Sequence, residues 1–417
     1  MDEPIALVVG GGASGMMAAG RAAELGATVS LLEKTPKLGN KLRITGKGRC
    51  NVTNVAPLED FIDHFGANGR FLYGAFSRFF VDDLRAFFAQ RGAPTVVERG
   101  GRVFPEANDA DVIADALLAY LRVGGVQLRR RTRIDALLVK DGAIRGVACA
   151  GREFPAQAVI VATGGASYPG TGSTGDGYRL LEAVGHTIVP PRPALVPLVT
   201  AEPFVAGLQG LSLRHVRATL LLNGRALASE FGEMLFTHYG ISGPIILSLS
   251  KRAAEAATRG RAEIAIDLKP ALNDEQLDAR LRRDFDQFGR RSYHRLLAEL
   301  LPRLLIPVFL ELTGIAPDKP GNQITAEERG RLFRLLRDFR LTIVGSRPIA
   351  EAIITAGGVA VNELDPRTMQ SRLVRGLYCC GEVIDIDADT GGYNLQAAFS
   401  TGYLAGEAAA HALGYGM

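Results

Sequence analysis

Short apolar runs alternate with helical patterns at the start of the chain. Ile5–Val9 and Thr28–Leu32 are apolar runs of the kind found in buried parallel strands. The Ala- and Met-rich segment Ser14–Leu25 between them suits a helix that packs closely on a sheet, and Gly26 is typical of a helix end. This segment therefore predicts a β-α-β unit and a parallel sheet covered by helices.

Further elements of this type are expected up to residue 162 and again from residue 343. The pattern predicts helices at Leu84–Arg91 and Ala110–Val123, a hairpin from Ile134–Val139 and Gly146–Ala150, buried strands at Ala158–Ala162 and Leu377–Cys380, and a closing helix at Ala397–Leu413.

The middle of the chain has a different pattern. Three prolines in Pro190–Pro193 indicate a domain boundary. Short β-rich runs follow at Leu195–Val199, Val216–Leu222 and Ala262–Asp267, and helical periodicity then dominates in Glu275–Phe288, Tyr293–Leu301 and Ala326–Leu336. We expect a discontinuous domain of residues 1–190 and 343–417, a β-rich insert of residues 191–269 and a helical insert of residues 270–342.

Composition narrows the functional classes. A length of 417 residues suits two or three domains, and the content of 47% hydrophobic and 22% charged residues is ordinary for a globular protein. The net charge of +4 is spread along the chain, and the densest basic runs, Arg129–Arg133 and Arg280–Arg283, are short. We interpret these runs as solvated surface, so nucleic acid is not an expected partner. The expected state is a monomer or a homodimer.

The cysteines and the apolar stretches predict a cytoplasmic protein without a structural metal. Cys50, Cys149, Cys379 and Cys380 form no C-x-x-C pair and show no metal-ligand spacing. No apolar stretch reaches about 18 residues without a charge or a breaker, and no signal peptide is recognised, so neither a membrane span nor export is expected.

The loop after the first predicted strand carries the strongest motif. Gly10–Gly15 fits G-x-G-x-x-G, follows a strand and opens a helix. In such a loop the first glycine permits a tight turn, the second lets the backbone approach a pyrophosphate, and the third lets the helix pack on the strand. Glu33 ends the next strand, where its carboxylate can accept hydrogen bonds from a ribose and would repel a 2′-phosphate. The alternative is a glycine loop that serves only as a turn.

Three further segments favour FAD over NAD. Lys34–Asn54 is a long loop rich in glycine and positive charge, where an NAD dehydrogenase normally continues into a helix. Val159–Gly165 is a strand that ends in Ala-Thr-Gly-Gly, and Gly391–Gln396 leads into a helix whose N-terminus favours negative charge on a reduced flavin. The loop could also be solvated surface. Gly170–Gly175 matches G-x-G-x-x-G by letter, but no strand precedes it. It suits the cap of a helix that begins near Asp176, with Ser173 or Thr174 near its N-cap.

These segments define the predicted site. The residues predicted to bind the cofactor are Gly10, Gly12, Ala13, Ser14, Gly15, Glu33, Lys34, Lys41, Thr45, Gly46, Gly48, Arg49, Cys50, Asn51, Ala162, Thr163, Gly164, Gly381, Glu382, Asp385, Gly392, Tyr393, Asn394, Leu395 and Gln396. The candidate catalytic residues are Asn51, His238 and Tyr393, and Tyr168 and Tyr239 are further candidates for lining the site. His238 suits proton transfer near neutral pH, and its alternative is a structural role in the Gly240–Pro244 turn. Cys50 is interpreted as packing near the cofactor rather than as a nucleophile, and no metal is expected.

The chain resembles the BaiN-like, aminoacetone-oxidase family of FAD-dependent oxidoreductases over essentially its whole length. The segments that carry the resemblance are Thr45–Asn54, Gly164–Gly177, Phe236–Pro244, Gly357–Met369 and Gly381–Gln396. The resemblance implies an α/β fold: a Rossmann-like FAD-binding domain of the two-dinucleotide-binding type with a β-barrel-like insert and a small helical insert. It also implies that the flavin lies where the inserts meet the FAD domain, and it fixes no substrate.

The expected activity is hydride transfer between a small organic substrate and flavin N5. Oxygen, NAD(P)H as a transient donor, or another carrier would complete the cycle. Two alternatives stay open: an FAD-dependent tRNA-modifying protein, and a flavoprotein sensor or electron-transfer partner.

Overall fold

Two compact units make up the computed structural model, which describes residues 5–416. The first unit holds the chain up to Ala194 and again from Ile349, and the second holds Leu195–Pro348. Each unit has its own hydrophobic core. The boundaries predicted from the sequence, at 190/191, 269/270 and 342/343, remain predictions of domain organisation.

A five-stranded parallel sheet forms the centre of the first unit, in the order β19-β10-β1-β2-β6. Its strands are β1 (Ile5–Val9), β2 (Thr28–Glu33), β6 (Gln127–Arg130), β10 (Ala158–Val161) and β19 (Leu377–Cys379). β1, β2, β10 and β19 are buried almost throughout, as expected when helices cover both faces of a parallel sheet. β19 places the C-terminal part of the chain in the same sheet as the N-terminal strand.

Helices and three small sheets surround this sheet. The helices are α1 (Ala13–Glu24), α2 (Asn40–Ile44), α3 (Leu58–Asp63), α4 (Tyr73–Arg78), α5 (Val81–Ala89), α6 (Ala110–Val123), α7 (Asp176–Glu182) and α13 (Tyr393–Ala412). The small sheets are β3 (Thr53–Asn54), β5 (Arg102–Pro105) and β4 (Thr95–Val97); β7 (Ala136–Lys140), β8 (Ala143–Cys149) and β9 (Arg152–Pro155); and β11 (Ile188–Ala194) with β18 (Ile354–Val359).

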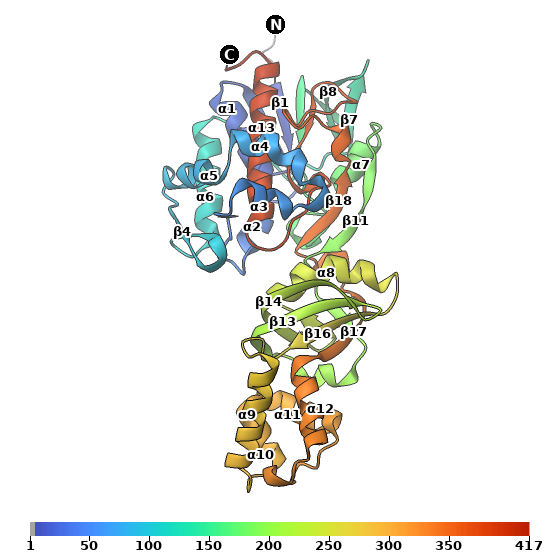
Figure 1. Cartoon of the computed structure of the whole chain (residues 1–417). Coiled ribbons are helices and arrows are strands. Elements are labelled where there is room, and N and C mark those ends of the chain that lie inside the picture. The colour runs from blue at the N-terminus through green and yellow to red at the C-terminus, as the bar shows by residue number, and fades with distance from the viewer. Residues whose placement is uncertain (1–4, 417) are drawn as a thin grey trace. The chain divides into compact units, whose positions relative to one another are not determined.

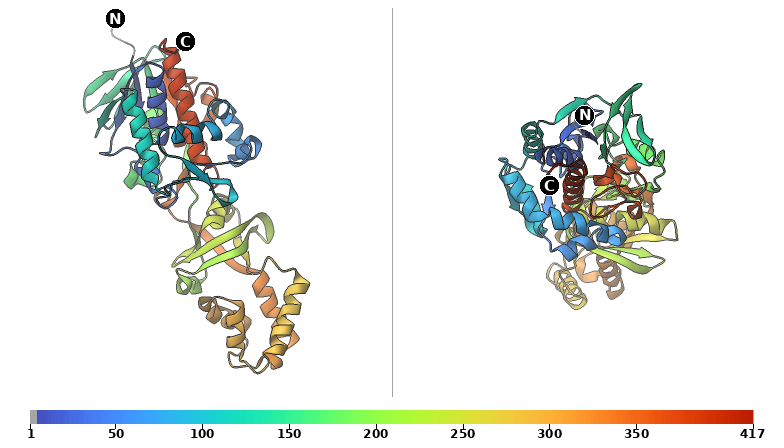
Figure 2. Two further views of the ribbon diagram at one scale, coloured as in Figure 1. Left: turned by 90° about the vertical axis from the view of Figure 1, so that its left-hand side faces the viewer. Right: turned by 90° about the horizontal axis from the view of Figure 1, so that it is seen from above.

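The C-terminal helix α13 lies against the N-terminal helix α1, as Figures 1 and 2 show for the red and dark blue ends of the chain. Small residues make the close approach possible. A Cβ atom at Gly402 would overlap the carbonyl oxygen of Ser14, and one at Gly406 would overlap that of Ala18. The two backbones therefore touch one helical turn apart, and no larger side chain fits at either point.

A closed six-stranded barrel forms the second unit, in the order β12-β15-β14-β13-β16-β17. Its strands are β12 (Leu198–Thr200), β13 (Ser212–Leu222), β14 (Arg225–Thr237), β15 (Gly240–Ser242), β16 (Ala262–Asp267) and β17 (Phe339–Ser346), and its helices are α8 (Pro244–Ala257), α9 (Asp274–Gln287), α10 (Tyr293–Leu300), α11 (Ile306–Thr313) and α12 (Ala326–Arg337). The helices α9–α12 are inserted between β16 and β17, which pair antiparallel (Figure 1).

The structure differs from the predicted starts of two helices and contains elements that the sequence pattern did not reveal. The proline run Pro190–Pro193 lies within strand β11, which pairs along one side with β18, and the N-terminal part of the first unit ends with this strand, at Ala194. α7 has Gly175 as its N-cap, in a left-handed conformation, rather than Ser173 or Thr174. The closing helix begins at Tyr393 rather than Ala397. The helices α8 and α11, which the sequence pattern did not reveal, are also present.

Candidate cofactor site

The glycine turn after β1 leaves open space where a ligand would approach. A Cβ atom at Gly10 would overlap the carbonyl oxygen of Ala162, and one at Gly15 would overlap the carbonyl oxygen of Gly10. These two glycines are required by the fold. A Cβ atom at Gly12, in contrast, would meet nothing within 4 Å. Gly12 is also the N-cap of α1, so the open space lies at the positive end of a helix.

Glu33 lies beside this turn, as the sequence predicted. Its carboxylate accepts a hydrogen bond from the backbone N–H of Gly11 at 2.7 Å and another from that of Thr35 at 2.7 Å. The residue is buried. Two backbone donors therefore hold the carboxylate in place, and each oxygen keeps a lone pair for a further donor such as a ribose hydroxyl.

The carboxyl ends of three neighbouring strands bring distant segments to one edge of the sheet. The N–H of Ala162 donates to the carbonyl of Val9 at 2.8 Å, and that of Cys380 donates to the carbonyl of Val161 at 3.1 Å. Gly381 follows on and lies so close to Ser14 on α1 that a Cβ atom there would overlap its hydroxyl. In open α/β sheets this edge is where ligands bind.

The loop before β3 meets the turn that starts α13. The side-chain amide of Asn54 donates to the carbonyl of Gly391 at 3.1 Å, and a Cβ atom at Gly392 would overlap the carbonyl oxygen of Thr53. The loop itself closes through a hydrogen bond of 2.9 Å from the N–H of Cys50 to the carbonyl of Thr45, with positive φ at Gly46 and Gly48. The two glycine-rich segments from opposite ends of the chain are therefore neighbours.

The charged candidates of this loop already have partners. Lys34 forms an ion pair with Asp176 at 2.7 Å, and Arg49 forms one with Glu98. Lys41 pairs with Glu382 at 2.7 Å. Since opposite charges neutralise these side chains, their main effect is to fix the loop rather than to present free charge.

Glu382 also connects two residues that the sequence analysis missed. It accepts hydrogen bonds from the hydroxyl of Ser167 at 3.1 Å and from the backbone N–H of Thr355 at 2.8 Å. The Thr355 hydroxyl in turn accepts from the N–H groups of Ala166 and Ser167. Ser167 lies within the segment Gly164–Gly177, and Thr355 lies just before the segment Gly357–Met369, both of which carried the resemblance. The sequence does not show that the two residues meet at Glu382, because that contact depends on the pairing of distant strands.

Among the buried polar atoms that lack a hydrogen-bond partner in the described part of the chain, two belong to the loop before β3 and to the segment after β10. They are Oδ1 of Asn51 and the hydroxyl oxygen of Thr163. Burial without a hydrogen bond costs free energy, so such atoms call for a partner that the protein chain does not supply. Asn51 belongs to the loop before β3, and Thr163 follows β10. Their chemistry fits the polar edge of a bound cofactor.

The remaining candidates at the start of α13 have structural contacts. Asn394 holds the preceding loop, because its side chain accepts from the N–H of Ala388 at 2.9 Å and donates back to its carbonyl at 2.9 Å. Gln396 is fully buried, and its side-chain amide donates a hydrogen bond to the hydroxyl of Ser400 at 2.9 Å. The carboxylate of Asp385 accepts a hydrogen bond from the side chain of Asn68 at 3.0 Å. Leu395 packs against the hydrophobic core.

Tyr393 lies in an aromatic cluster at the N-terminus of α13. Its ring stacks on His64 with centroids 3.9 Å apart and meets Phe61 edge-on at 4.7 Å. Burial, together with the nearby Asp389 and Asp60, raises the pKa of the Tyr393 phenol. The phenol is therefore protonated at neutral pH. His64, which the sequence analysis did not single out, has its Nδ1 3.0 Å from Asp389.

Cys50 is unsuited to act as a nucleophile. It is completely buried in the loop before β3, and burial raises the pKa of its thiol to about 12. The thiolate is the nucleophilic form, so almost none is present at neutral pH. The interpretation that Cys50 packs near the cofactor stays a prediction.

The other candidate side chains lie elsewhere. Tyr168 is partly exposed in the first unit, with a positive φ of 51°. His238 and Tyr239 belong to the second unit, in the turn between β14 and β15, where their rings meet edge-on at 4.7 Å. Among the described residues, the exposed His238 side chain has no hydrogen-bond partner. The structural role in the Gly240–Pro244 turn therefore has no hydrogen bond to support it.

Comparison with known families gives a match over nearly the whole chain. The model described as the HI0933-like protein Rossmann domain matches residues 5–408. The chain belongs to this family. The fold prediction, a Rossmann-like α/β domain of the FAD-binding type with a barrel insert, is confirmed.

Curated relatives match this chain over nearly its full length. The chain is 35% identical to the 3-dehydro-bile acid delta(4,6)-reductase of Clostridium scindens, over 97% of this chain and 98% of the relative. It is 30% identical to the ribosomal RNA dihydrouridine synthase of Escherichia coli, over 97% of each chain. Among solved structures, the 3-ketosteroid delta1-dehydrogenase of Sterolibacterium denitrificans has a TM-score of 0.56, with 14% identity and coverage of 99% of this chain and 100% of that one.

These findings confirm the predicted class, an FAD-dependent oxidoreductase, at the level of the family. Among the described residues, no helix has the length and apolar character needed to cross a membrane, and no group of three or more metal-ligating side chains is present.

Proposed function

We propose that this protein binds FAD at the edge formed by β1, β10 and β19, and that it reduces a carbon–carbon double bond conjugated to a carbonyl group. The observation that carries the proposal is the open space at Gly12 beside the fixed carboxylate of Glu33. A helix N-terminus with a ribose-binding carboxylate next to it suits the ADP half of a dinucleotide.

The residues that would hold the cofactor divide by chemistry. The first-turn N–H groups of α1, from Ala13 and Ser14, would bind the pyrophosphate, and Glu33 would bind the ribose. Asn51 and Thr163 offer buried polar atoms without a protein partner to the remainder of the molecule. The N-terminus of α13, capped by Gly392, would favour negative charge on the reduced ring.

When bound and reduced by the electron donor, FAD would supply the hydride for the substrate from N5. The protein's own residues would supply the proton. The Tyr393 phenol keeps its proton at neutral pH, because burial raises its pKa, and it can donate from its Oη atom. Asn51 would orient a carbonyl oxygen through its amide, and His238 remains a second candidate for proton transfer.

Two relatives support the choice of substrate class. One is named for reducing the delta(4,6) bonds of a 3-dehydro-bile acid, and the other for making dihydrouridine from ribosomal RNA. In both cases the bond that is saturated is conjugated to a carbonyl group. We infer the same reaction type here, with a small organic substrate, and with NAD(P)H as the electron donor in preference to oxygen as an acceptor.

A decisive experiment has two stages. The protein is purified and its visible absorption is examined for bound flavin; then the bleaching of that absorption is followed without oxygen, first with NADH or NADPH and next with enones or amines. We expect bleaching by a nicotinamide and recovery on addition of an enone. Bleaching by amines alone would reverse the proposed direction, and a colourless protein that takes up no FAD would refute the proposal.

RNA modification is the second candidate, and it rests on a specific comparison. The relative at 30% identity that is named a ribosomal RNA dihydrouridine synthase covers the chain as fully as the bile-acid reductase does. Dihydrouridine in RNA from cells that lack this protein, measured against wild-type RNA, separates the two candidates. We infer a cytoplasmic location, which is compatible with both candidate functions. The four free cysteine thiols support it.

A further inference from the structure

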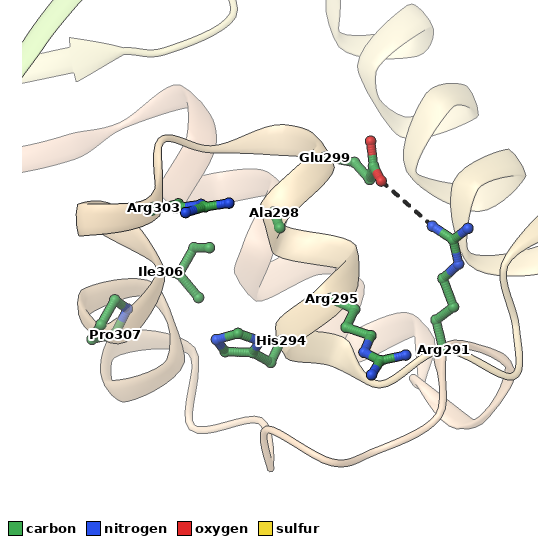
Figure 3. Close-up of a pocket in the computed structure, with 8 residues that line it drawn as sticks. All are labelled: Arg291, His294, Arg295, Ala298, Glu299, Arg303, Ile306 and Pro307. Carbon is green, nitrogen blue, oxygen red and sulfur yellow. Dashed lines mark hydrogen bonds and ion pairs between the residues drawn. The ribbon is translucent and has the colours of Figure 1, made fainter.

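A hollow of about 630 Å³ lies on the helical segment of the second unit, within the size range of small-molecule sites (Figure 3). It is formed by the residues just before α10, by α10 itself, by the start of α11 and by the turn between the two helices. Its lining residues are Arg291, His294, Arg295, Ala298, Glu299, Arg303, Ile306 and Pro307. All of them belong to one unit, so the hollow does not depend on how the two units are arranged.

The hollow carries more positive than negative charge. Three arginines line it against one carboxylate, and that carboxylate, Glu299, lies 3.4 Å from Arg291. Among the described residues, Arg295 and Arg303 have no carboxylate partner. Other arginines of the segment, such as Arg282 and Arg329, pair with acidic side chains, whereas Arg290 and Arg334 also form no ion pair with a described carboxylate.

The arrangement of the side chains is suited to an anion. In Figure 3, Arg303 and His294 lie on either side of Ile306, so two groups that can donate hydrogen bonds flank an apolar wall. Low-dielectric walls strengthen the field of nearby charges. Guanidinium groups bind phosphate through paired N–H donors, and an unpaired guanidinium loses no existing ion pair when it does so.

We propose that this hollow is a binding site for phosphate groups. The ligand is either the phosphodiester backbone of a polynucleotide or a small phosphorylated molecule, because both present the same oxygen atoms to Arg295 and Arg303. The proposal goes beyond the flavin chemistry and does not depend on it, since every residue that carries it lies outside the first unit.

The test compares two double variants with the same loss of charge. Arg295→Gln with Arg303→Gln removes the unpaired arginines. Arg282→Gln with Arg283→Gln removes two exposed arginines of α9 that already face Asp278 and Asp284. Binding of a fluorescent RNA oligonucleotide is measured by anisotropy at several salt concentrations, and inorganic phosphate and AMP are added as competitors.

We expect the first variant to bind about 10- to 100-fold more weakly, as expected for the loss of one or two charge-assisted contacts, and the second to bind like the wild type. For single-stranded RNA, the slope of log affinity against log salt should fall by about 1.4, since each lost phosphate contact contributes about 0.7.

The competitors identify the source of the phosphate. Retained RNA binding in the presence of AMP and phosphate supports a polynucleotide, whereas binding of AMP that disappears in the first variant supports a small phosphorylated ligand. Equal binding by both variants, or binding of none of the three probes by the wild type, overturns the proposal. Unchanged bound flavin and thermal unfolding in the first variant show that any loss is local.

Discussion

The candidate cofactor site of the first unit and the hollow of the second differ in how far their basic side chains are paired with carboxylates. Around the candidate cofactor site, Lys34, Lys41 and Arg49 each pair with a carboxylate, and the groups left for a ligand are backbone N–H groups, neutral side chains and the carboxylate of Glu33. In the hollow of the second unit, Arg295 and Arg303 have no such partner among the described residues. The first arrangement suits a ligand recognised by shape and hydrogen bonds, and the second suits one recognised by charge.

The largest expected effect concerns the glycine turn. Replacement of Gly15 by alanine places a Cβ atom against the carbonyl of Gly10, which we expect to cost about 3 kcal/mol or more of unfolding free energy. Replacement of Gly12 by alanine places it in open space, so the fold should persist while flavin binding falls. Thermal unfolding and flavin content measured on both variants test this, and equal stability of the two would contradict it.

The next effect concerns Glu407, which joins α13 to the N-terminal half of the first unit. Its buried carboxylate pairs with Arg21 at 2.6 Å and Arg78 at 2.8 Å. We expect Glu407→Gln to cost about 2–3 kcal/mol at neutral pH, since it leaves Arg21 without its buried partner.

That cost should depend on pH. Burial alone would raise the pKa of Glu407, but hydrogen bonds from Arg21 and Arg78 outweigh it, and the net pKa lies below its ordinary value of 4.5. The pair therefore stabilises the fold fully above about pH 4.5, and this stabilisation is lost as the pH falls through the lowered value. Denaturant unfolding of wild type and variant should converge in acid; a constant difference would rule out the ion pair as the cause.

A smaller effect is expected at Glu382, which is less deeply buried. Glu382→Gln weakens the contacts to Lys41, Ser167 and Thr355, and we expect a cost of about 1–2 kcal/mol together with weaker flavin retention. Glu98→Gln, which breaks the more exposed pair with Arg49, is the control and should cost less than 1 kcal/mol. The comparison fails if the control loses as much flavin as Glu382→Gln.

The smallest effect is predicted for the hollow. Because Arg295 and Arg303 form no ion pair with a described carboxylate, replacing both with glutamine should change stability by less than about 0.5 kcal/mol. Flavin retention should also vary little with salt, whereas binding of a phosphorylated ligand at the hollow should weaken steeply. A clear loss of thermal stability in the double variant would indicate a structural role instead.

The sequence predicted the structure of the first unit best at positions where backbone geometry allows few residue types. The spacing Gly10–Gly15 and the acidic residue at 33 predicted the β-α-β unit and the meeting of Glu33 with the turn, because each glycine has a steric reason. The start of α13 was misplaced by four residues, since Gly391 and Gly392 suggest a loop and give no sign of how soon the helix follows.

Features that depend on distant pairing could not be predicted. Strand β11 over the proline run is one such feature, because it pairs along one side with β18 from the C-terminal part of the chain, an arrangement that tolerates the missing N–H groups. Arg291, Arg295 and Arg303 are spread over thirteen residues and form no charge run, so only the packing of α10 against the following turn shows that they share a hollow.

The contact of α13 with α1 has a consequence for the order in which the protein can fold. Gly402 and Gly406 close on Ser14 and Ala18, and β19 completes the sheet begun by β1. On the ribosome, the segment with the glycine turn is therefore synthesised first, but the contacts that surround it are completed last, after the entire barrel has been synthesised. Such long-range contacts slow folding, and a chain stopped before Leu377 would lack β19 and leave strand β10 with an uncovered edge.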